Sequence, residues 1–313
     1  MILVSFIAVL ALVETALLIT GRVVAGGLAP DPAEPGAIEA DSLIACFGAS
    51  FVQGIGSSAP EQSFPAQLEL MLNQRHPDCA VRVLNEGLAG YNSSDIFRHM
   101  EARLAEYPRM PDLILVLGFN NNTWNLHRCS ALVQGYAELP GDKRWLDHLG
   151  RTRIGRFVLL MRLGDVPFGR QLAEIDESTW HDIQGPSPQE ILNPKRRADR
   201  EFLHAWLLND MRSMSELAEA VGSSVAFSMP TNSYMNGLVR ECAFELGLNL
   251  YDTPGDEALW LFYGWISSDG WHPNDRGYSV YAAHIVDSIE ALGPTAILQC
   301  PGEGAKQPLR LID

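Results

Sequence analysis

A carboxylate and an imidazole lie close together in the segment Asp269-Gly270-Trp271-His272-Pro273, near the C-terminus of the chain. An aspartate that accepts the Nδ1 proton of a histidine fixes the tautomer of the ring and stabilises the imidazolium. The Nε2 atom can then take a proton from a serine or a cysteine. Similar residues also occur in surface turns that cap a helix, so the pair indicates catalysis only if the chain supplies a nucleophile.

Ser50 is the candidate nucleophile. It follows an apolar run and lies in the glycine-flanked turn Gly48-Ala49-Ser50-Phe51-Val52-Gln53-Gly54. In such a turn the serine N–H can point to the same side as Oγ and donate to an oxyanion. A helix cap or a simple turn is the plain alternative for a serine in this setting.

Two further segments offer donors to an oxyanion. Gly90 lies in a loop after the second apolar run, where a glycine lets a bare N–H approach a substrate oxygen. Asn120 follows the third run, and its amide can donate to the same oxygen; loss of one such donor typically lowers the rate by about 10²–10³. With Ser50, Asp269 and His272, these groups provide a nucleophile, an oxyanion hole, a base and its orienting group.

Short apolar runs alternate along the chain with segments of helical periodicity. The predicted strands are residues 43–47, 81–84, 113–117, 224–229 and 248–251, and the predicted helices are residues 64–73, 96–104, 202–220 and 280–292. Strands that alternate with helices pair in parallel, so the pattern predicts an α/β fold, a three-layer α/β/α sandwich with a central parallel sheet of about five strands. Ligands bind at the carboxyl ends of such strands, where Ser50, Gly90 and Asn120 lie.

These motifs resemble the conserved blocks of the SGNH hydrolases, also called the GDSL family. Residues 46–51 resemble the block that contains the nucleophile. Residues 84–92 resemble the second block, which implies the oxyanion-hole role for Gly90. Residues 118–121 are similar to the third block, usually Gly-x-Asn-Asp, which implies that Asn120 is the amide donor.

The last block of the family matches residues 268–274 closely, so the resemblance implies a triad of Ser50, Asp269 and His272. It also implies the flavodoxin-like sandwich of these hydrolases and the activity of a serine esterase or acylhydrolase. No metal or organic cofactor is required by such chemistry.

The resemblance covers about residues 43–122 and 224–292, with two departures. Ala49 stands where the name-giving aspartate is usual, and Asn121 in place of aspartate is expected to remove a structural contact. Neither change deletes a catalytic group. The Gly-x-Ser-x-Gly motif of the α/β-hydrolases is disfavoured because Val52 occupies its final glycine position, and the dinucleotide and P-loop glycine motifs are absent.

The composition excludes some classes of partner. The 313-residue chain is 47% hydrophobic and has a formal net charge of −15. Because phosphate binding needs clustered lysine and arginine, nucleic acid is not an expected partner. The five cysteines form no Cys-x-x-Cys pair, so no zinc or iron–sulfur site is expected. Cys46 is expected to be a small buried hydrophobe, whereas the spacing assigns no disulfides.

Residues 1–24 contain an almost continuous apolar run from Ile2 to Thr20, which approaches the thickness of a hydrocarbon core. No lysine or arginine precedes the run, which favours an uncleaved membrane anchor over a signal peptide cut after Ala25. The charge of Arg22 is too small a bias to fix the orientation. We expect a membrane-anchored protein with its catalytic domain outside the cytoplasm, in the cell envelope; secretion after signal cleavage is the alternative.

A linker rich in proline and glycine, residues 25–40, precedes the predicted hydrolase domain of residues 41–293, and a tail of residues 294–313 follows. Residues 123–200 are too long for one crossover and are predicted to be an insertion. Within it, residues 154–163 have amphipathic helical spacing with arginines between the apolar positions. This helix packs on the body in one interpretation, and covers the active site or lies on a membrane surface in the other.

Three functions fit this sequence, in descending order of preference. The first is a membrane-tethered serine esterase that acts on an acylated glycan, a lipid or another small ester. The second is an O-acyltransferase, in which a sugar hydroxyl intercepts the acyl-enzyme in place of water. The third is a binding module that retains the fold without catalysis.

Overall fold

The structure is a computed structural model that describes residues 39–144, 192–228, 233–251, 264–267, 272–291 and 298. The chain divides into two units. Among the described residues, the larger unit contains residues 39–121 and those from 207 onward, and the smaller unit contains residues 122–144 and 192–206. The predicted anchor and linker lie almost entirely outside the described residues, as does the predicted helix at 154–163. In the part of the chain that is described, no helix is both long and apolar enough to span a membrane.

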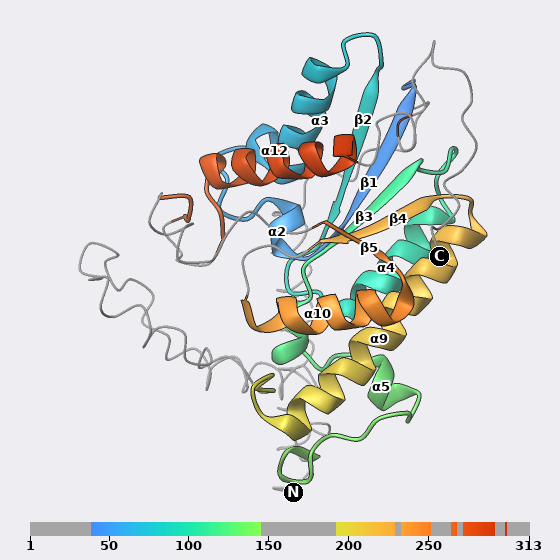
Figure 1. Cartoon of the computed structure of the whole chain (residues 1–313), viewed down its shortest axis with the longest axis vertical. Coiled ribbons are helices and arrows are strands. Elements are labelled where there is room, and N and C mark those ends of the chain that lie inside the picture. The colour runs from blue at the N-terminus through green and yellow to red at the C-terminus, as the bar shows by residue number, and fades with distance from the viewer. Residues whose placement is uncertain are drawn as a thin grey trace, which may run out of the picture. The chain divides into compact units, whose positions relative to one another are not determined.

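The larger unit is built on a sheet of five parallel strands (Figure 1). The strands are β1 (Ser42–Gly48), β2 (Val81–Gly87), β3 (Leu113–Leu117), β4 (Ser224–Ser228) and β5 (Asn249–Tyr251). Their order across the sheet is β2-β1-β3-β4-β5, which is the flavodoxin-like order. The predicted fold class is therefore confirmed.

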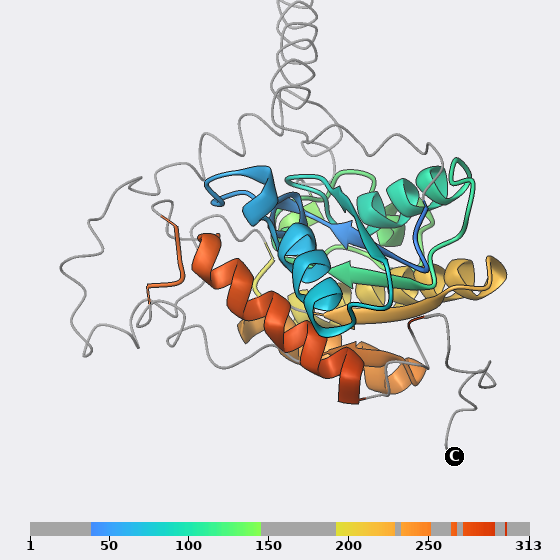
Figure 2. The same cartoon turned by 90° about the horizontal axis from the view of Figure 1, so that it is seen from above.

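Helices cover both faces of this sheet (Figures 1 and 2). On one face lie α3 (Phe64–Arg75) and α12 (Asp275–Ala291), which pack against each other. On the other face lie α4 (Ser93–Leu104), the part of α9 (Arg197–Ala220) from residue 207 onward, and α10 (Ser233–Leu246). The sequence did not predict α10, whose Gly237 weakens the helical propensity of the segment.

The core follows from the alternation of side chains along the strands. In β1, Ile44 and Cys46 pack into the cluster that contains residues of α3 and α12, whereas Phe47 on the other face meets His99 of α4 with ring centroids 5.9 Å apart. All seven residues of β1 are buried, as expected for a strand covered on both sides. Cys46 behaves as the predicted small hydrophobe, and its burial raises the pKa of the thiol.

The smaller unit includes α5 (Ser130–Val133), a 3-10 turn (Gly141–Lys143) and the first part of α9. The backbone N–H of Leu192 donates to the carbonyl of Thr123 at 2.7 Å, so residues on the two sides of the undescribed stretch lie together. Asp199 is fully buried; it pairs with Lys143 and accepts a hydrogen bond from the backbone of Asn193 at 2.8 Å. The predicted domain and insertion boundaries stay predictions.

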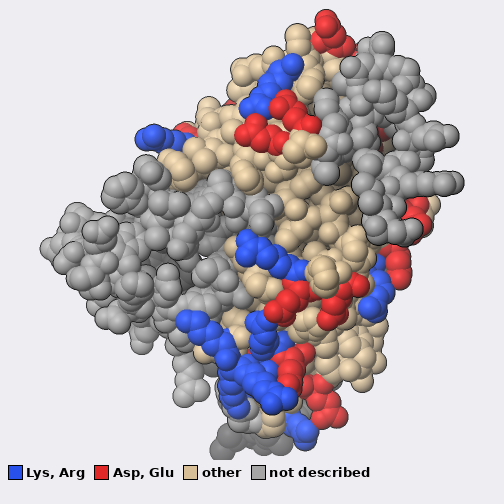
Figure 3. All heavy atoms as spheres, in the orientation of Figure 1, with Lys and Arg blue, Asp and Glu red and all other residues tan. Residues whose placement is uncertain are grey.

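Charges of both signs lie side by side on the face drawn in Figure 3. Over α3 and α12, for example, Arg75 pairs with Asp287 at 2.8 Å and with Glu290 at 2.6 Å. Exposed pairs of this kind contribute about 0–1 kcal/mol each to stability, so the fold depends mainly on its apolar core.

Candidate active site

The structure brings the predicted nucleophile and base together. Nε2 of His272 lies 2.8 Å from Oγ of Ser50, although the two residues are 222 positions apart in the sequence. Both side chains are partly exposed. A base within hydrogen-bond distance of a serine hydroxyl can take its proton as the oxygen attacks a substrate.

Ser50 opens the four-residue helix α2 (Ser50–Gln53), which begins one residue after β1 ends. Two glycines allow α2 to pack closely against the ends of the strands. A Cβ on Gly87 would lie 2.0 Å from the backbone nitrogen of Gln53, and a Cβ on Gly48 would lie 2.4 Å from the carbonyl oxygen of Leu117. The glycines that end the apolar runs therefore allow the close approach of backbone that places Ser50 at the edge of the sheet.

Phe51 fixes the orientation of α2 from the other side. Its ring packs edge-on against Tyr278 and Tyr281, with centroids 5.1 and 4.8 Å apart, and lies 5.9 Å from Phe64 of α3. Both tyrosines belong to α12, the helix that follows His272. The residue beside the nucleophile is thus anchored on the helix that begins just after the base.

Hydrogen bonds between its own backbone groups hold the segment that carries His272. Ser267 donates its N–H to the carbonyl of His272 at 2.8 Å, and Asn274 donates to the carbonyl of Trp265 at 2.8 Å. The Asn274 side chain then accepts from the N–H of Gly277 at 3.0 Å at the start of α12. Asp269 lies outside the described residues, so its place in the triad stays a prediction.

The turn after α2 joins the helix that carries Ser50 to this segment. Ser58 donates its backbone N–H and its hydroxyl to the carboxylate of Asp275, at 2.7 and 2.6 Å, and Tyr278 donates to the carbonyl of Ile55 at 2.6 Å. A Cβ on Gly56 would lie 2.5 Å from the carbonyl oxygen of Pro273. The turn is therefore in direct contact with the backbone next to His272.

Residues 88–92, which we call the oxyanion loop, follow β2 and carry Gly90. Leu88 donates its N–H to the carbonyl of Gly48 at 3.0 Å, which ties the loop to the end of β1. Gly90 has a φ of 78°, a conformation that glycine adopts without strain. Because β1 lies between β2 and β3, Gly90 and Asn120 follow the strands on either side of the one that leads to Ser50. The topology thus supports the predicted oxyanion hole.

Asn121 makes a side-chain contact that the sequence did not predict. We expected its replacement of an aspartate to remove a contact, but its side-chain amide donates to the carbonyl of Tyr91, in the oxyanion loop, at 2.9 Å. An ionised aspartate has no proton to donate there. The role of Gln53, whose side chain also reaches this loop, was likewise missed, since an isolated polar residue in a short apolar segment carries no signal for a distant contact.

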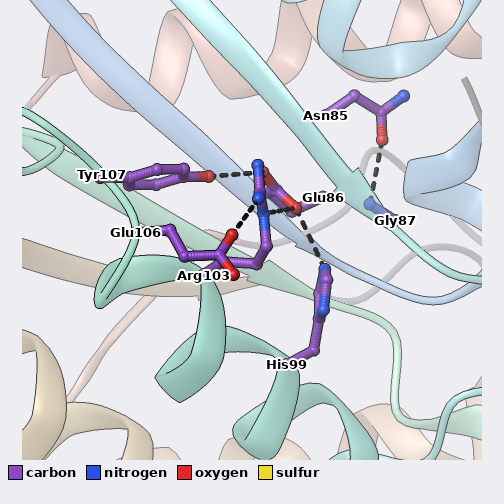
Figure 4. Close-up of polar contacts among 7 residues, drawn as sticks. All are labelled: Asn85, Glu86, Gly87, His99, Arg103, Glu106 and Tyr107. Carbon is purple, nitrogen blue, oxygen red and sulfur yellow. Dashed lines mark hydrogen bonds and ion pairs between the residues drawn. The ribbon is translucent and has the colours of Figure 1, made fainter. Parts of the chain in front are cut away.

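An ionic cluster around the buried Glu86 lies between β2 and α4 (Figure 4). Glu86, near the end of β2, accepts hydrogen bonds from Arg103 at 2.9–3.0 Å and from the hydroxyl of Tyr107 at 2.6 Å, and it lies 3.0 Å from Nε2 of His99. Burial alone raises the pKa of Glu86, but the hydrogen bonds outweigh it and hold the pKa below its ordinary value. The His99 ring also packs edge-on against Tyr91, with centroids 6.0 Å apart. The cluster thereby joins β2 and α4, the two elements that the oxyanion loop connects.

Burial and the neighbouring Glu86 carboxylate raise the pKa of the Tyr107 hydroxyl. Hydrogen bonds to Glu86 raise the pKa of Arg103. Both shifts favour the protonated forms in which Tyr107 and Arg103 donate to Glu86.

Comparisons with known proteins show likeness of structure only. No protein-family model and no curated protein sequence matches the chain. Among solved structures, it is similar to a two-domain esterase (CEX) active on acetylated mannans, with 15% identity and a TM-score of 0.46, over 87% of this chain and 53% of that one. The chain thus spans about half the length of that esterase.

Two shorter proteins match over most of their length. The SGNH-hydrolase family esterase AlinE4 is 16% identical, with a TM-score of 0.40 over 82% of this chain and 96% of that one. The lipase/acylhydrolase from Enterococcus faecalis is 13% identical, with a TM-score of 0.45 over 80% of this chain and 96% of that one. With its parallel sheet in the flavodoxin-like order, a serine in the helix that follows β1 and a histidine three residues before α12 begins, the chain has the α/β/α fold that its motif resemblance to the SGNH hydrolases implies.

Proposed function

We propose that this protein is a serine esterase that cleaves carboxylic esters through an acyl-enzyme on Ser50. The Oγ atom bonds to the ester carbonyl carbon while its proton passes to Nε2 of His272. The tetrahedral intermediate then expels the alcohol, which takes the proton back from Nε2. A water oxygen then bonds to the acyl carbon while its proton passes to the same nitrogen. The second tetrahedral intermediate breaks its bond to Oγ, which releases the acid, and Oγ of Ser50 takes the proton back from Nε2.

The observation that carries this proposal is the 2.8 Å separation between Nε2 of His272 and Oγ of Ser50. The partial exposure of both side chains supports access by a substrate. We assign the oxyanion to the N–H groups of Ser50 and Gly90 and the amide of Asn120, because these groups follow three adjacent strands. Asp269 would accept the Nδ1 proton of His272 and stabilise the imidazolium.

Substitution of the nucleophile tests the proposal. Ser50→Ala should lose hydrolysis of p-nitrophenyl acetate, while its circular dichroism spectrum and thermal unfolding match those of the wild type. Ser288→Ala is the control, because that hydroxyl donates to the carbonyl of His284 within α12 and lies outside the site. Undiminished hydrolysis by Ser50→Ala would contradict the proposal. If an added carbohydrate acceptor captures the acyl group from the wild type, the same residues serve as an acyltransferase.

We also propose that the N-terminal segment tethers the catalytic domain to a membrane, in the cell envelope. The apolar run from Ile2 to Thr20 supports this proposal, because its length approaches that of a membrane-spanning helix. The full chain should remain in the membrane pellet after alkaline carbonate extraction, whereas a chain that starts at Asp41 should be soluble. A mature protein that begins after Ala25 would show instead that the segment is a cleaved signal peptide.

A further inference from the structure

Gln53, the last residue of α2, connects the nucleophile helix to the oxyanion loop. Its side chain is 9% exposed, which is unusual for a residue type that is mostly found on the surface. Its Oε1 atom accepts the backbone N–H of Ala89 at 2.8 Å, across 36 positions of sequence. The group that holds the residue next to Gly90 therefore comes from the same short helix as Ser50.

The two sides of Gly90 are held by side-chain amides. On one side Gln53 accepts the N–H of Ala89, and on the other side Asn121 donates to the carbonyl of Tyr91 at 2.9 Å. A glycine with a φ of 78° has wide backbone freedom. Hydrogen bonds on both neighbours restrict that freedom and thereby limit the directions in which the Gly90 N–H can point.

The backbone of α2 can transmit this restraint. A Cβ on Gly87 would lie 2.0 Å from the nitrogen of Gln53, so the helix is in contact with the end of β2, from which the oxyanion loop departs. Phe51 holds the same helix on α12. These contacts hold the backbone of Gln53 in place. The hydrogen bond that its side chain accepts then sets the distance between the oxyanion loop and Ser50.

We propose that Gln53 is a positioning residue for ester hydrolysis, which holds the oxyanion loop so that the Gly90 N–H points at the oxygen of an acyl group on Ser50. This inference rests on the proposed function and deepens it. Negative charge on that oxygen develops only in the transition state, so a misdirected donor lowers kcat and leaves KM nearly unchanged. Gln53 itself touches neither the substrate nor the reacting atoms.

Gln53→Met tests the inference because methionine has a similar shape and no comparable acceptor. We expect kcat for p-nitrophenyl acetate to fall by about 10- to 100-fold, with KM changed less than about twofold. Gln67→Met is the matched control. Gln67 is also buried, at 7% exposure, and its side-chain amide donates to Gln62 at 2.6 Å; within the described part of the chain it makes no hydrogen bond to the oxyanion loop. A kcat loss no larger in Gln53→Met than in Gln67→Met would overturn the inference.

A double-mutant cycle shows whether Gln53 acts through Gly90. Gly90→Ala disturbs the donor directly, because alanine is strained at this φ. If the inference holds, Gln53→Met lowers kcat by less than about twofold when added to Gly90→Ala, because the donor is already misplaced. Additive losses of kcat would overturn it.

Hydrogen exchange distinguishes failure of this inference from failure of the proposed function. The Ala89 amide should exchange faster in Gln53→Met than in the wild type, whether or not the protein hydrolyses esters. Faster exchange of the Ala89 amide in Gln53→Met, together with a wild type that cleaves no ester, would contradict the proposed function and leave the hydrogen bond between Gln53 and Ala89 intact as a structural fact. Unchanged exchange, with wild-type hydrolysis normal, would overturn the positioning role alone.

Discussion

Asn121 donates to the carbonyl of Tyr91 at 2.9 Å, at a position where an aspartate is usual in the blocks that the chain resembles. Asn121→Asp should therefore be harmful here, because an ionised carboxylate cannot donate and repels the carbonyl oxygen. We expect kcat for ester hydrolysis to fall by about tenfold with KM nearly unchanged.

Asn73→Asp is the control for this substitution. The Asn73 amide donates to the carbonyl of Val81 at 2.8 Å, so its replacement also removes a partly buried donor, but away from the site. It should lower the thermal stability and leave kcat unchanged. Equal values of kcat for Asn121→Asp and the wild type would show that the Tyr91 contact does not position the oxyanion loop.

Gly56 lies where a side chain would displace the base. Its φ is 96°, and an added Cβ would lie 2.5 Å from the carbonyl oxygen of Pro273 and 3.0 Å from Cβ of His272. Gly56→Ala should lower kcat by about 10²-fold, because a shift of the order of 1 Å in a catalytic group has an effect of that size.

Gly247→Ala separates this steric effect from backbone strain. Gly247 also has a positive φ, of 63°, but nothing lies within 4 Å of its added Cβ. Both variants should lose stability by about 1 kcal/mol or more, while only Gly56→Ala loses activity. A similar kcat in the two variants would contradict the contact between the turn and the His272 segment.

At the level of secondary-structure elements, the Glu86 cluster joins β2 to α4, the two elements that the oxyanion loop connects (Figure 4). Glu86 is 4% exposed, and removing one partner of a buried ion pair costs about 3–5 kcal/mol. Glu86→Gln should therefore lower the free energy of unfolding in urea at pH 7 by about that amount. Glu106→Gln, which removes an exposed partner of Arg103, should cost about 1 kcal/mol or less.

The loss of unfolding free energy in Glu86→Gln should depend on pH. The folded protein holds the pKa of Glu86 below its ordinary value of 4.5, so the carboxylate stabilises the fold fully above that pH. The stabilisation is lost as the pH falls through the lower pKa of the folded state. The difference in unfolding free energy between wild type and Glu86→Gln should therefore narrow below about pH 4.5. A difference that stays constant from pH 7 to pH 3 would contradict this assignment.

For the whole molecule, the strands could be predicted because strands buried on both faces are continuous apolar runs, as in residues 113–117. The last residues of β2 were missed, since Asn85 and Glu86 are polar and only their pairing with Cys46 and Phe47 shows that the strand continues. Strand propensity alone does not predict an extension that depends on such tertiary contacts.

The proximity of Ser50 and His272 could be predicted more readily than the contacts of the residues around them. Ser50 and His272 are identified by type and motif, and the structure places them 2.8 Å apart. The contacts of Gln53 and Asn121 depend on which loops meet in space, and a side-chain amide in a loop has no pattern of its own. The role of Asp269 and the N-terminal anchor remain predictions.

The central claim is that Ser50 forms a covalent acyl-enzyme with the help of His272. Acid quenching of the protein during turnover of p-nitrophenyl acetate, followed by peptide mass spectrometry, tests it most directly. The account predicts an acetyl group on Ser50 in the wild type, none in Ser50→Ala, and acylation slowed by about 10³-fold or more in His272→Ala. An acetyl group on another residue, or normal ester hydrolysis by Ser50→Ala, would contradict it.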